Sequence, residues 1–324
     1  MKWFFYHNRQ LRELTNKVVL KITSSHLEAP DASERKLIEQ LRHDFEKIDR
    51  QVTHQPHQPS EKVWTDNMQR LTELVRHEDP RLFLHWGVIQ KAMFITNAMY
   101  ILIELFFLKK QKKWSKRWRD AIQEDKIGTP IPYWCFPSSS GNLIHHAYHV
   151  SQLETQMHID VSEFDFIVEC GGGYGSMCRL FRNLGFKGTY IIFDLPHFSA
   201  LQKYYLESVG VKVVDEINND TEMQVKLVSD MDELHDSVER VESRKSLFLA
   251  TWSLSETPLK LRKDIRLLYR KFDLLFFAYQ ESFGEVNNIE YFGKLQREEK
   301  QFHWQTWEVE SLPTHYYSAG KFQE

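Results

Sequence analysis

The sequence has little cysteine and no excess of charge, and both features narrow the class of protein. Its 324 residues include three cysteines, an odd number with no CxxC spacing: Cys135, Cys170 and Cys178. We therefore expect neither a disulfide framework nor a zinc site, and a reducing compartment is the simpler inference. The formal net charge of −3 argues against a surface built throughout for nucleic acid.

Signals for export or membrane spanning are also missing. The N-terminus has no long apolar segment and no small-residue cleavage site, so we expect no signal peptide and a cytoplasmic location. Ala92 to Leu108 is largely apolar, but it has 17 residues and contains Glu104, which makes it a poor membrane span. We expect it to be the central helix of a helical domain.

The basic run Lys109 to Arg119 is either a solvated helix face or a contact for a membrane surface, an anionic polysaccharide or RNA.

Length and composition indicate a catalytic domain with an accessory domain. A chain of 324 residues that is 42% hydrophobic can bury a sizeable core and exceeds one typical small domain. Residues 1–127 have helical patterns. Residues 128–141 contain three prolines and two terminal glycines and are expected to form a linker or a lid loop. We assign residues 142–324 to the catalytic domain.

The most informative stretch is a buried strand that runs into a glycine-rich turn. Phe166 to Cys170 is apolar except for Glu169, and the turn that follows contains Gly171, Gly172, Gly173 and Gly175. Glycine permits positive φ and removes the Cβ that would hold a ligand away from the backbone. A ligand is therefore expected to lie across this turn.

The acidic residues near this turn indicate which ligand it binds. A dinucleotide fingerprint fits imperfectly, because Ser176 occupies its third glycine position. Glu169 at the strand end would repel a diphosphate and attract a cation. Asp194 ends the next apolar strand, where a carboxylate can bind ribose hydroxyls. S-adenosylmethionine carries an ammonium and a sulfonium but no phosphate, and it is the cofactor we predict.

These segments, together with Trp252 to Glu256, resemble the sugar O-methyltransferase family of class I S-adenosylmethionine-dependent enzymes. The resemblance covers roughly the last two-thirds of the chain. It implies an α/β fold, with a Rossmann-like, mostly parallel sheet that ends in an antiparallel hairpin, and an N-terminal helical domain. The cofactor-binding residues expected from the motifs and the resemblance are Glu169, Gly171, Gly173, Tyr174, Gly175, Asp194, Leu195, Asp230, Met231, Thr251 and Trp252.

The third strand and the catalytic base are less clearly marked. The strand is either Val211–Val214, ending at Asp215, or Val225–Val228, ending at Asp230; the second is preferred because Met231 could cover an adenine ring. The alternative role for Asp230 is a helix cap.

For the base, an imidazole or a carboxylate near the cofactor methyl is needed. The candidates are His145, His146, His149 and Glu256, with Glu256 and His146 favoured; no metal ligand set is indicated.

Amide and aromatic side chains suit a sugar acceptor, since hydroxyl groups need paired hydrogen bonds and the C–H face of a sugar stacks on rings. The candidate acceptor residues are Tyr133, Ser253, Gln280, Asn288 and Tyr291. The predicted reaction is methyl transfer to a sugar or glycan hydroxyl, with S-adenosylhomocysteine as the product. The alternatives are an RNA or polyanion methyltransferase, and a non-catalytic module of this fold at a membrane; nucleic acid is the less favoured partner, and the oligomeric state stays open.

Overall fold

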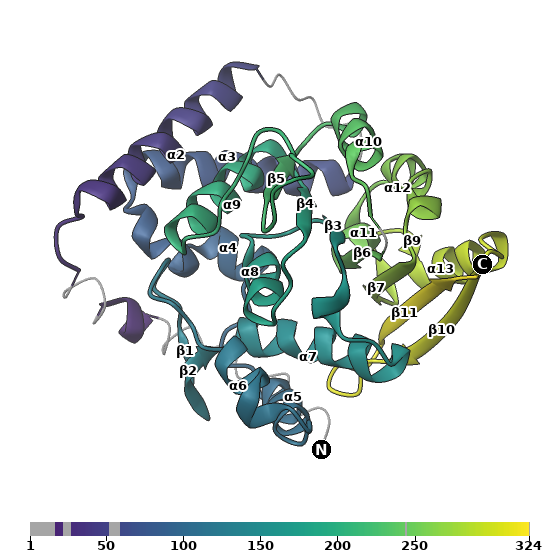
Figure 1. The fold of residues 1–324 in the computed structure, drawn as a ribbon. Coiled ribbons are helices and arrows are strands. Elements are labelled where there is room, and N and C mark those ends of the chain that lie inside the picture. The colour runs from purple at the N-terminus through teal and green to yellow at the C-terminus, as the bar shows by residue number, and fades with distance from the viewer. Residues whose placement is uncertain (1–16, 22–26, 52–58, 244, 324) are drawn as a thin grey trace.

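The centre of the computed structural model, which describes residues 17–21, 27–51, 59–243 and 245–323, is a seven-stranded mixed sheet. Its strands lie in the order β10-β11-β7-β6-β3-β4-β5 (Figure 1). They are β3 (Phe166–Cys170), β4 (Thr189–Phe193), β5 (Val225–Val228), β6 (Ser246–Thr251), β7 (Leu274–Gln280), β10 (Phe302–Glu308) and β11 (His315–Phe322).

Strands β5, β4, β3, β6 and β7 are parallel, whereas β11 pairs antiparallel with both β7 and β10. The expected Rossmann-like methyltransferase fold is therefore confirmed, including the terminal hairpin. The third strand is Val225–Val228, as preferred, while Val213 forms only an isolated bridge to Val225. Parallel strands bring their carboxyl ends to one edge of the sheet, so the predicted motifs meet there.

Helices cover both faces of the sheet, as the near-continuous apolar strands require. Along β3, Ile167 belongs to the core on one face, and Phe166 and Val168 belong to the core on the other. The first face is covered by α2 (Ala32–Gln51), α3 (Pro59–His77), η2 (Pro80–His85), α4 (Gly87–Ala92), α5 (Tyr100–Lys109), η3 (Trp114–Lys116), α6 (Trp118–Ala121), α7 (Gly141–Met157), α8 (Ser176–Asn183) and α9 (Pro196–Ser208). The second is covered by α10 (Met231–Arg240), α11 (Ser253–Glu256), α12 (Leu259–Arg266), η5 (Tyr269–Lys271) and α13 (Asn288–Glu298).

The N-terminal helices share a continuous core with the sheet. Phe83 is fully buried, and its ring lies 5.5 Å from that of Tyr174 in the glycine turn and 6.1 Å from that of Tyr205 on α9. In α2 and α3, Phe45 and Trp64 likewise meet aromatic rings of α9. The described part of the chain before residue 128 is thus a layer packed onto the sheet domain.

The apolar stretch 92–108 does not form the single helix we expected. Between α4 and α5 the chain leaves the helical path, and tertiary contacts satisfy its polar groups: Ile95 N donates to Asn142 Oδ1 (3.1 Å), and Asn97 Nδ2 donates to Pro132 O (3.1 Å). Buried backbone groups need such partners. Across the described ranges, no helix has both the length and the apolar character needed to cross a bilayer.

The predicted linker contains a β-hairpin rather than a plain loop. Strands β1 (Pro132–Tyr133) and β2 (Phe136–Ser140) pair antiparallel, and Ser140 caps α7 by accepting a hydrogen bond from Leu143 N (3.1 Å). The backbone of Gly141 packs against the carbonyl of Thr96 with no room for a Cβ. The hairpin therefore fixes the start of α7, the helix that carries the candidate histidines.

We expect Phe83→Ala to destabilise the whole protein, because it removes a buried ring that joins the helical layer to the sheet domain. The loss should be about 3–5 kcal/mol in a single urea unfolding transition, monitored by circular dichroism and tryptophan fluorescence. The matched control is Phe106→Ala, at a ring that is 54% exposed, with an expected cost below about 1 kcal/mol. Two separate transitions, of which only one moves, would contradict the shared core.

Candidate active site

The glycine turn lies between β3 and α8 at the carboxyl edge of the sheet. Gly171, Gly173 and Gly175 have φ values of +76°, +58° and +96°. A Cβ on Gly171 would overlap the Ser253 side chain, whose hydroxyl donates a hydrogen bond to Cys170 O. Gly171 and Gly173 are partly exposed. The turn therefore offers accessible backbone to a ligand, and the end of β3 is in contact with the segment after β6.

Two carboxyl groups lie at this turn. Glu169 is almost fully buried and accepts a hydrogen bond from Tyr190 OH (2.9 Å), and burial raises its pKa to about 8. Asp194 accepts hydrogen bonds from Leu195 N and from Gln202 Nε2, each at 2.8 Å. Burial raises the pKa of Asp194 to about 7, although these hydrogen bonds oppose the shift. Because a cation beside these groups would favour their ionised forms, the site suits a positively charged ligand.

Gln202 is a residue of this site that the sequence analysis missed. Its Nε2 donates to Gly173 O (3.0 Å) as well as to Asp194, whereas its Oε1 is buried with no hydrogen-bond partner among the described residues. The signal in the sequence is an amide on the mostly apolar inward face of an amphipathic helix, beside Leu201 and Tyr205. An unpaired buried acceptor next to the glycine turn is available to a hydroxyl or ammonium donor.

The segment after β6 turns sharply toward α7. Trp252 follows Thr251 and has a φ of +63°, which is uncommon for a bulky residue. Its backbone N donates to Ala278 O (2.7 Å), and its ring stacks on His145 with centroids 5.2 Å apart. The ring of His149 lies 4.7 Å away. Strained positions held by their surroundings concentrate at functional sites, and this one brings Trp252 onto two of the predicted histidines.

His145 is held by a carboxylate that the sequence analysis did not assign to the site. Its Nδ1 lies 2.9 Å from both carboxylate oxygens of Glu104, which is fully buried in α5. Ser311 Oγ also donates to Glu104, at 2.6 Å. No described residue forms a hydrogen bond with Nε2 of His145. The sequence signal was a single acid within an apolar stretch, but only the packing of α5 on α7 shows its partner.

The other two histidines of α7 have different surroundings. Nδ1 of His149 is hydrogen-bonded to Tyr317 OH, and its buried Nε2 has no partner within the described residues. Burial places the pKa of His149 well below the usual range. His146 faces α8, where its Nδ1 lies 2.8 Å from Ser176 Oγ, and burial lowers its pKa to about 3. At neutral pH both rings are therefore neutral.

Glu256 ends α11 at the same edge of the sheet. Gln280 Nε2 donates to its Oε1 (3.3 Å), and Ser255 Oγ donates to Gln280 Oε1 (2.7 Å). Burial raises the pKa of Glu256 to about 7. The carboxyl group is thus tied to the end of β7, and among the described residues it forms no hydrogen bond or ion pair with the α7 histidines.

Several predicted residues form hydrogen bonds that support the fold. Tyr133 is buried with its hydroxyl 3.4 Å from Ala98 O, and fully buried Asn288 accepts from Arg262 Nη1 (2.9 Å). Tyr174 points away from the turn into the helical layer, where Asn142 Nδ2 donates to its hydroxyl (3.2 Å). Asp230 is exposed and caps α10 by accepting from Glu233 N (3.0 Å).

The remaining candidates stay accessible at the edge. Ser253, Gln280 and Tyr291 are half-buried, although Ser253 donates to a backbone carbonyl and the Tyr291 ring covers the Arg262 guanidinium at 4.7 Å. Leu195 and Met231 are also half-buried, and Met231 packs against the second core. Among the described residues, no group of His, Cys, Asp and Glu has metal-binding geometry.

Comparisons with known proteins give distant structural similarities only. No protein-family model matches the chain, and a search of curated proteins finds no match. Among solved structures, S-adenosylhomocysteine-bound methyltransferase PaMTH1 of Podospora anserina is 8% identical over 84% of this chain and 100% of its own, with a TM-score of 0.38. The METTL16 methyltransferase domain is 12% identical over 55% and 67%, with a TM-score of 0.40.

An rRNA methylase from Streptococcus thermophilus is 16% identical over 52% of this chain and 96% of its own, with a TM-score of 0.36. Similarities at this distance assign neither a reaction nor an acceptor to the present chain. The functional argument therefore rests on the arrangement of its own residues.

Gly171→Ala should cost more stability than its backbone conformation alone explains. The new Cβ would both occupy a positive-φ position and overlap Ser253, so we expect a loss above about 2 kcal/mol in urea unfolding. Gly210→Ala is the matched control: its φ is +79°, but nothing lies within 4 Å of the position that the new Cβ would take, and about 1 kcal/mol is expected. Equal losses in the two variants would show that the approach of Ser253 is unimportant.

Proposed function

We propose that this chain is an S-adenosylmethionine-dependent O-methyltransferase that acts on a hydroxyl group of a sugar or glycan. The observation that carries the proposal is the gathering of three features at one edge of the sheet. These are a glycine turn with accessible backbone, the carboxyl groups of buried Glu169 and half-buried Asp194 beside it, and a carboxylate-held imidazole next to Trp252. Together they provide a place for a cationic cofactor and a base for a hydroxyl acceptor.

The residues around the glycine turn suit this cofactor chemically. Glu169 and Asp194 would oppose the phosphates of a dinucleotide but favour an ammonium and a sulfonium. Gly171 and Gly173 would supply backbone at the turn that Gly175 completes, Leu195 would border it after β4, and Thr251 and Trp252 would border it from β6. The buried Oε1 of Gln202 adds a free acceptor. S-adenosylmethionine, when bound, supplies an electrophilic methyl group, and S-adenosylhomocysteine is the product.

His145 is the base that the geometry favours. An ionised carboxylate only accepts hydrogen bonds, so Glu104 selects the tautomer of His145 with a proton on Nδ1 and a lone pair on Nε2. Nε2 can then take the hydroxyl proton as the acceptor oxygen forms its bond to the methyl carbon. Glu104 would stabilise the imidazolium that results, as the carboxylate does in a Ser-His-Asp triad.

The other candidate bases suit this role less well. His146 is hydrogen-bonded toward α8, and its low pKa of about 3 makes it a weak proton acceptor. Glu256, with a pKa raised to about 7, is a second base within the same edge and would serve an acceptor bound nearer β7. His149 has a free Nε2 but is paired with a neutral hydroxyl, which cannot offset the charge of an imidazolium.

A sugar acceptor is supported by the half-buried residues around the same edge. Ser253, Gln280 and Tyr291 provide a hydroxyl, an amide and an aromatic ring, and Trp252 adds a second ring. Such a set suits hydroxyl groups and an apolar C–H face. Holding the hydroxyl close to the methyl carbon would supply much of the rate acceleration.

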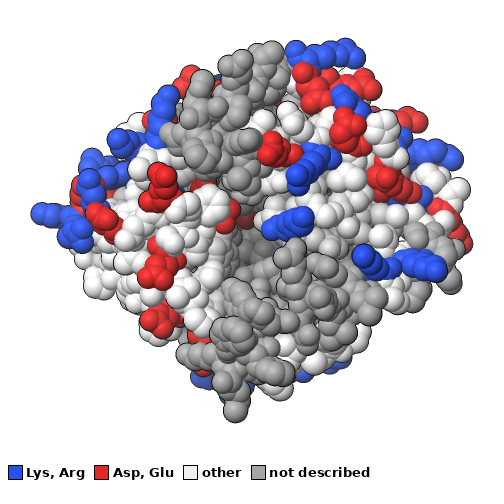
Figure 2. Space-filling view, turned by 180° about the vertical axis from the view of Figure 1, so that it is seen from behind, with Lys and Arg blue, Asp and Glu red and all other residues white. Residues whose placement is uncertain are grey.

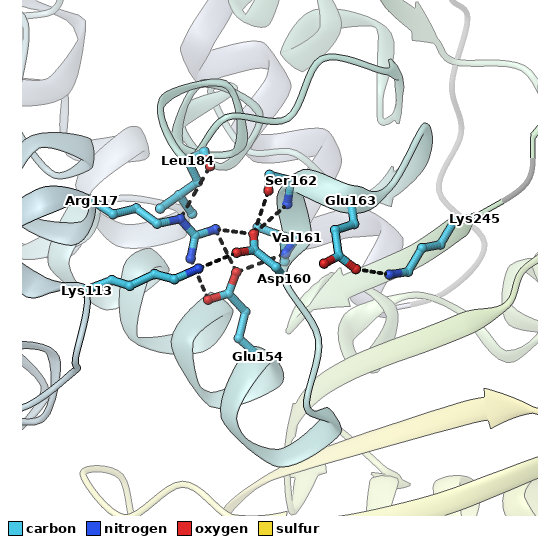
Figure 3. A network of polar contacts seen from close by, with 9 residues as sticks. All are labelled: Lys113, Arg117, Glu154, Asp160, Val161, Ser162, Glu163, Leu184 and Lys245. Carbon is cyan, nitrogen blue, oxygen red and sulfur yellow. Dashed lines mark hydrogen bonds and ion pairs between the residues drawn. The ribbon is translucent and has the colours of Figure 1, made fainter.

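RNA as an acceptor is supported less well by the basic run. Arg117 Nη1 and Nη2 donate to the two carboxylate oxygens of Glu154, each at 2.7 Å, and Lys113 donates to Asp160 at 2.7 Å (Figure 3). These two cations are therefore already paired. On the face in Figure 2, basic and acidic side chains are interspersed, whereas a nucleic-acid surface gathers cations.

S-adenosylhomocysteine should stabilise the protein, and its effect should grow with pH. At a concentration about 100-fold above Kd we expect a rise in Tm of about 5 °C. Between about pH 6 and pH 8.5 the affinity should increase, because Asp194 and Glu169, with pKa values of about 7 and about 8, lose protons and then attract the ligand's ammonium. Thermal unfolding and calorimetric titration provide the measurements.

The control for this experiment is NADH, which should give no stabilisation because its diphosphate faces the same carboxyl groups. Asp194→Asn should weaken the binding of S-adenosylhomocysteine and flatten its pH dependence, whereas Asp215→Asn should change neither. Stabilisation by NADH alone would overturn the proposed cofactor.

Glu104→Gln should slow methyl transfer while leaving cofactor affinity unchanged. The amide keeps the size of the side chain but cannot neutralise an imidazolium at His145, so kcat should fall about 100-fold or more. The assay is tritium transfer from S-adenosylmethionine to a panel of methyl glycosides. Ser311→Ala, which removes a different hydrogen bond to Glu104, should retain most of the activity.

A double substitution separates this role from simple loss of structure. Combining Glu104→Gln with His145→Asn should be no slower than His145→Asn alone, because the carboxylate acts through the imidazole. Additive losses, or a weakened affinity for S-adenosylhomocysteine in Glu104→Gln, would contradict the assignment.

A further inference from the structure

An apolar patch gathers on α5 and the neighbouring β1–β2 hairpin. Of the ten large hydrophobic residues that are exposed among the described residues, four lie here: Met99, Ile103, Phe106 and Trp134. The first three are spaced by four and three positions, so they share one face of the helix. Phe106 is 54% exposed and Trp134 is 44% exposed.

Contacts between the helix and the hairpin bring Trp134 to this patch. Trp134 N donates to Asn97 Oδ1 (2.8 Å), just before α5 begins, and the hydroxyl of Tyr133 lies 3.4 Å from Ala98 O. At the other end of α5, Lys109 Nζ lies 5.7 Å from the centre of the Phe136 ring. The hairpin thus runs beside the helix, and the four apolar side chains belong to one surface.

Five exposed cations lie in the segment that begins at the end of α5. They follow Phe106 directly along the chain: Lys109, Lys110, Lys112, Lys116 and Arg119. None of the five forms an ion pair with a described residue, and Asp120 is the single exposed acid between residues 99 and 121. By contrast, Lys113 and Arg117 from the same run are paired with Glu154 and Asp160, as Figure 3 shows. The basic run therefore divides into two cations paired with acids and a set without ion pairs that begins at the end of the apolar patch.

We infer that this surface docks the protein onto a bilayer that contains anionic lipid. Apolar side chains, including a tryptophan, would enter the headgroup region while the lysines and the arginine meet the lipid phosphates. The patch is too short to span a bilayer and is suited to lying on its surface. The acid of α5, Glu104, faces the opposite way, toward His145, so docking leaves the candidate active site unobstructed.

Two other occupants fit the same surface less well. A second copy of the chain that used this face in a symmetric dimer would bring two sets of unpaired cations together, which disfavours association. Nucleic acid would pair with the cations and could stack on Phe106 and Trp134, but it would leave the exposed aliphatic side chains of Met99 and Ile103 without an apolar partner. An anionic lipid surface satisfies both parts of the patch.

The test is flotation of the full chain with phosphatidylcholine vesicles, with and without phosphatidylglycerol. We expect binding to the anionic vesicles that weakens with salt, and little binding to phosphatidylcholine alone. Ile103→Ser combined with Phe106→Ser should reduce the partition coefficient by about tenfold or more. Lys110→Gln combined with Lys112→Gln should reduce it by about 25-fold, at about fivefold per cation.

The matched control is Leu267→Ser, since Leu267 is 71% exposed and lies beside Lys263, Arg266 and Arg270 on the far face of the sheet. It should bind vesicles as the unmodified chain does. Circular dichroism and urea unfolding of every variant would show whether each one is folded.

Three outcomes would overturn the inference. The first is equal flotation of the unmodified chain and the Ile103/Phe106 variant. The second is a lipid-free dimer in sedimentation velocity that this variant abolishes, which would assign the surface to a second copy. The third is salt-sensitive RNA binding without vesicle binding, which would assign it to a polyanion. Because none of these measurements involves methyl transfer, the result is independent of the proposed function.

Discussion

The close approach between the end of β3 and the segment after β6 is the constraint on which the rest of the site depends. The side chain of Ser253 occupies the space that a Cβ of Gly171 would need, and its hydroxyl donates a hydrogen bond to the carbonyl oxygen of Cys170. This contact holds Trp252 at positive φ and places its ring against the histidines of α7. A side chain in place of glycine at position 171 would therefore disturb both the cofactor turn and the candidate base.

The site also depends on a buried carboxylate whose oxygens are hydrogen-bonded. Glu104 has no exposed surface, and placing a carboxylate there without partners would cost several kcal/mol. His145 and Ser311 provide those partners from α7 and from the segment before β11. Three distant parts of the chain thus meet at one carboxylate, which ties the helical layer and the terminal hairpin to the candidate active site.

Helix α5 connects the two proposals. Its inward face holds Glu104 against His145, and its outward face carries the apolar residues that border the free cations. A helix that is apolar almost all round would normally be buried. In α5 the buried face is apolar apart from Glu104, while Ile103 and Phe106 remain exposed on the outer face. Each face thus carries residues that burial alone does not explain, which indicates a role for both faces.

The sequence by itself determined the glycine turn and the acids at the ends of β3 and β4. These are local signals: an apolar strand segment followed by glycines or by an acidic residue. The mostly parallel sheet and its terminal hairpin were expected from the family resemblance, and β10 and β11 form that hairpin. The break between α4 and α5 escaped prediction because Asn142 and Pro132, which satisfy the polar groups there, are distant in sequence.

Only the tertiary structure decided which residues of the candidate site act together. Glu104 and His145 are 41 positions apart, and His149 and Tyr317 are 168 apart, so no local pattern links them. The same is true of Tyr133 and Asn288, whose residue types suit a sugar but whose side chains are buried by packing. Periodicity and turn chemistry act between near neighbours, whereas hydrogen-bond partners and exposure depend on how whole elements pack.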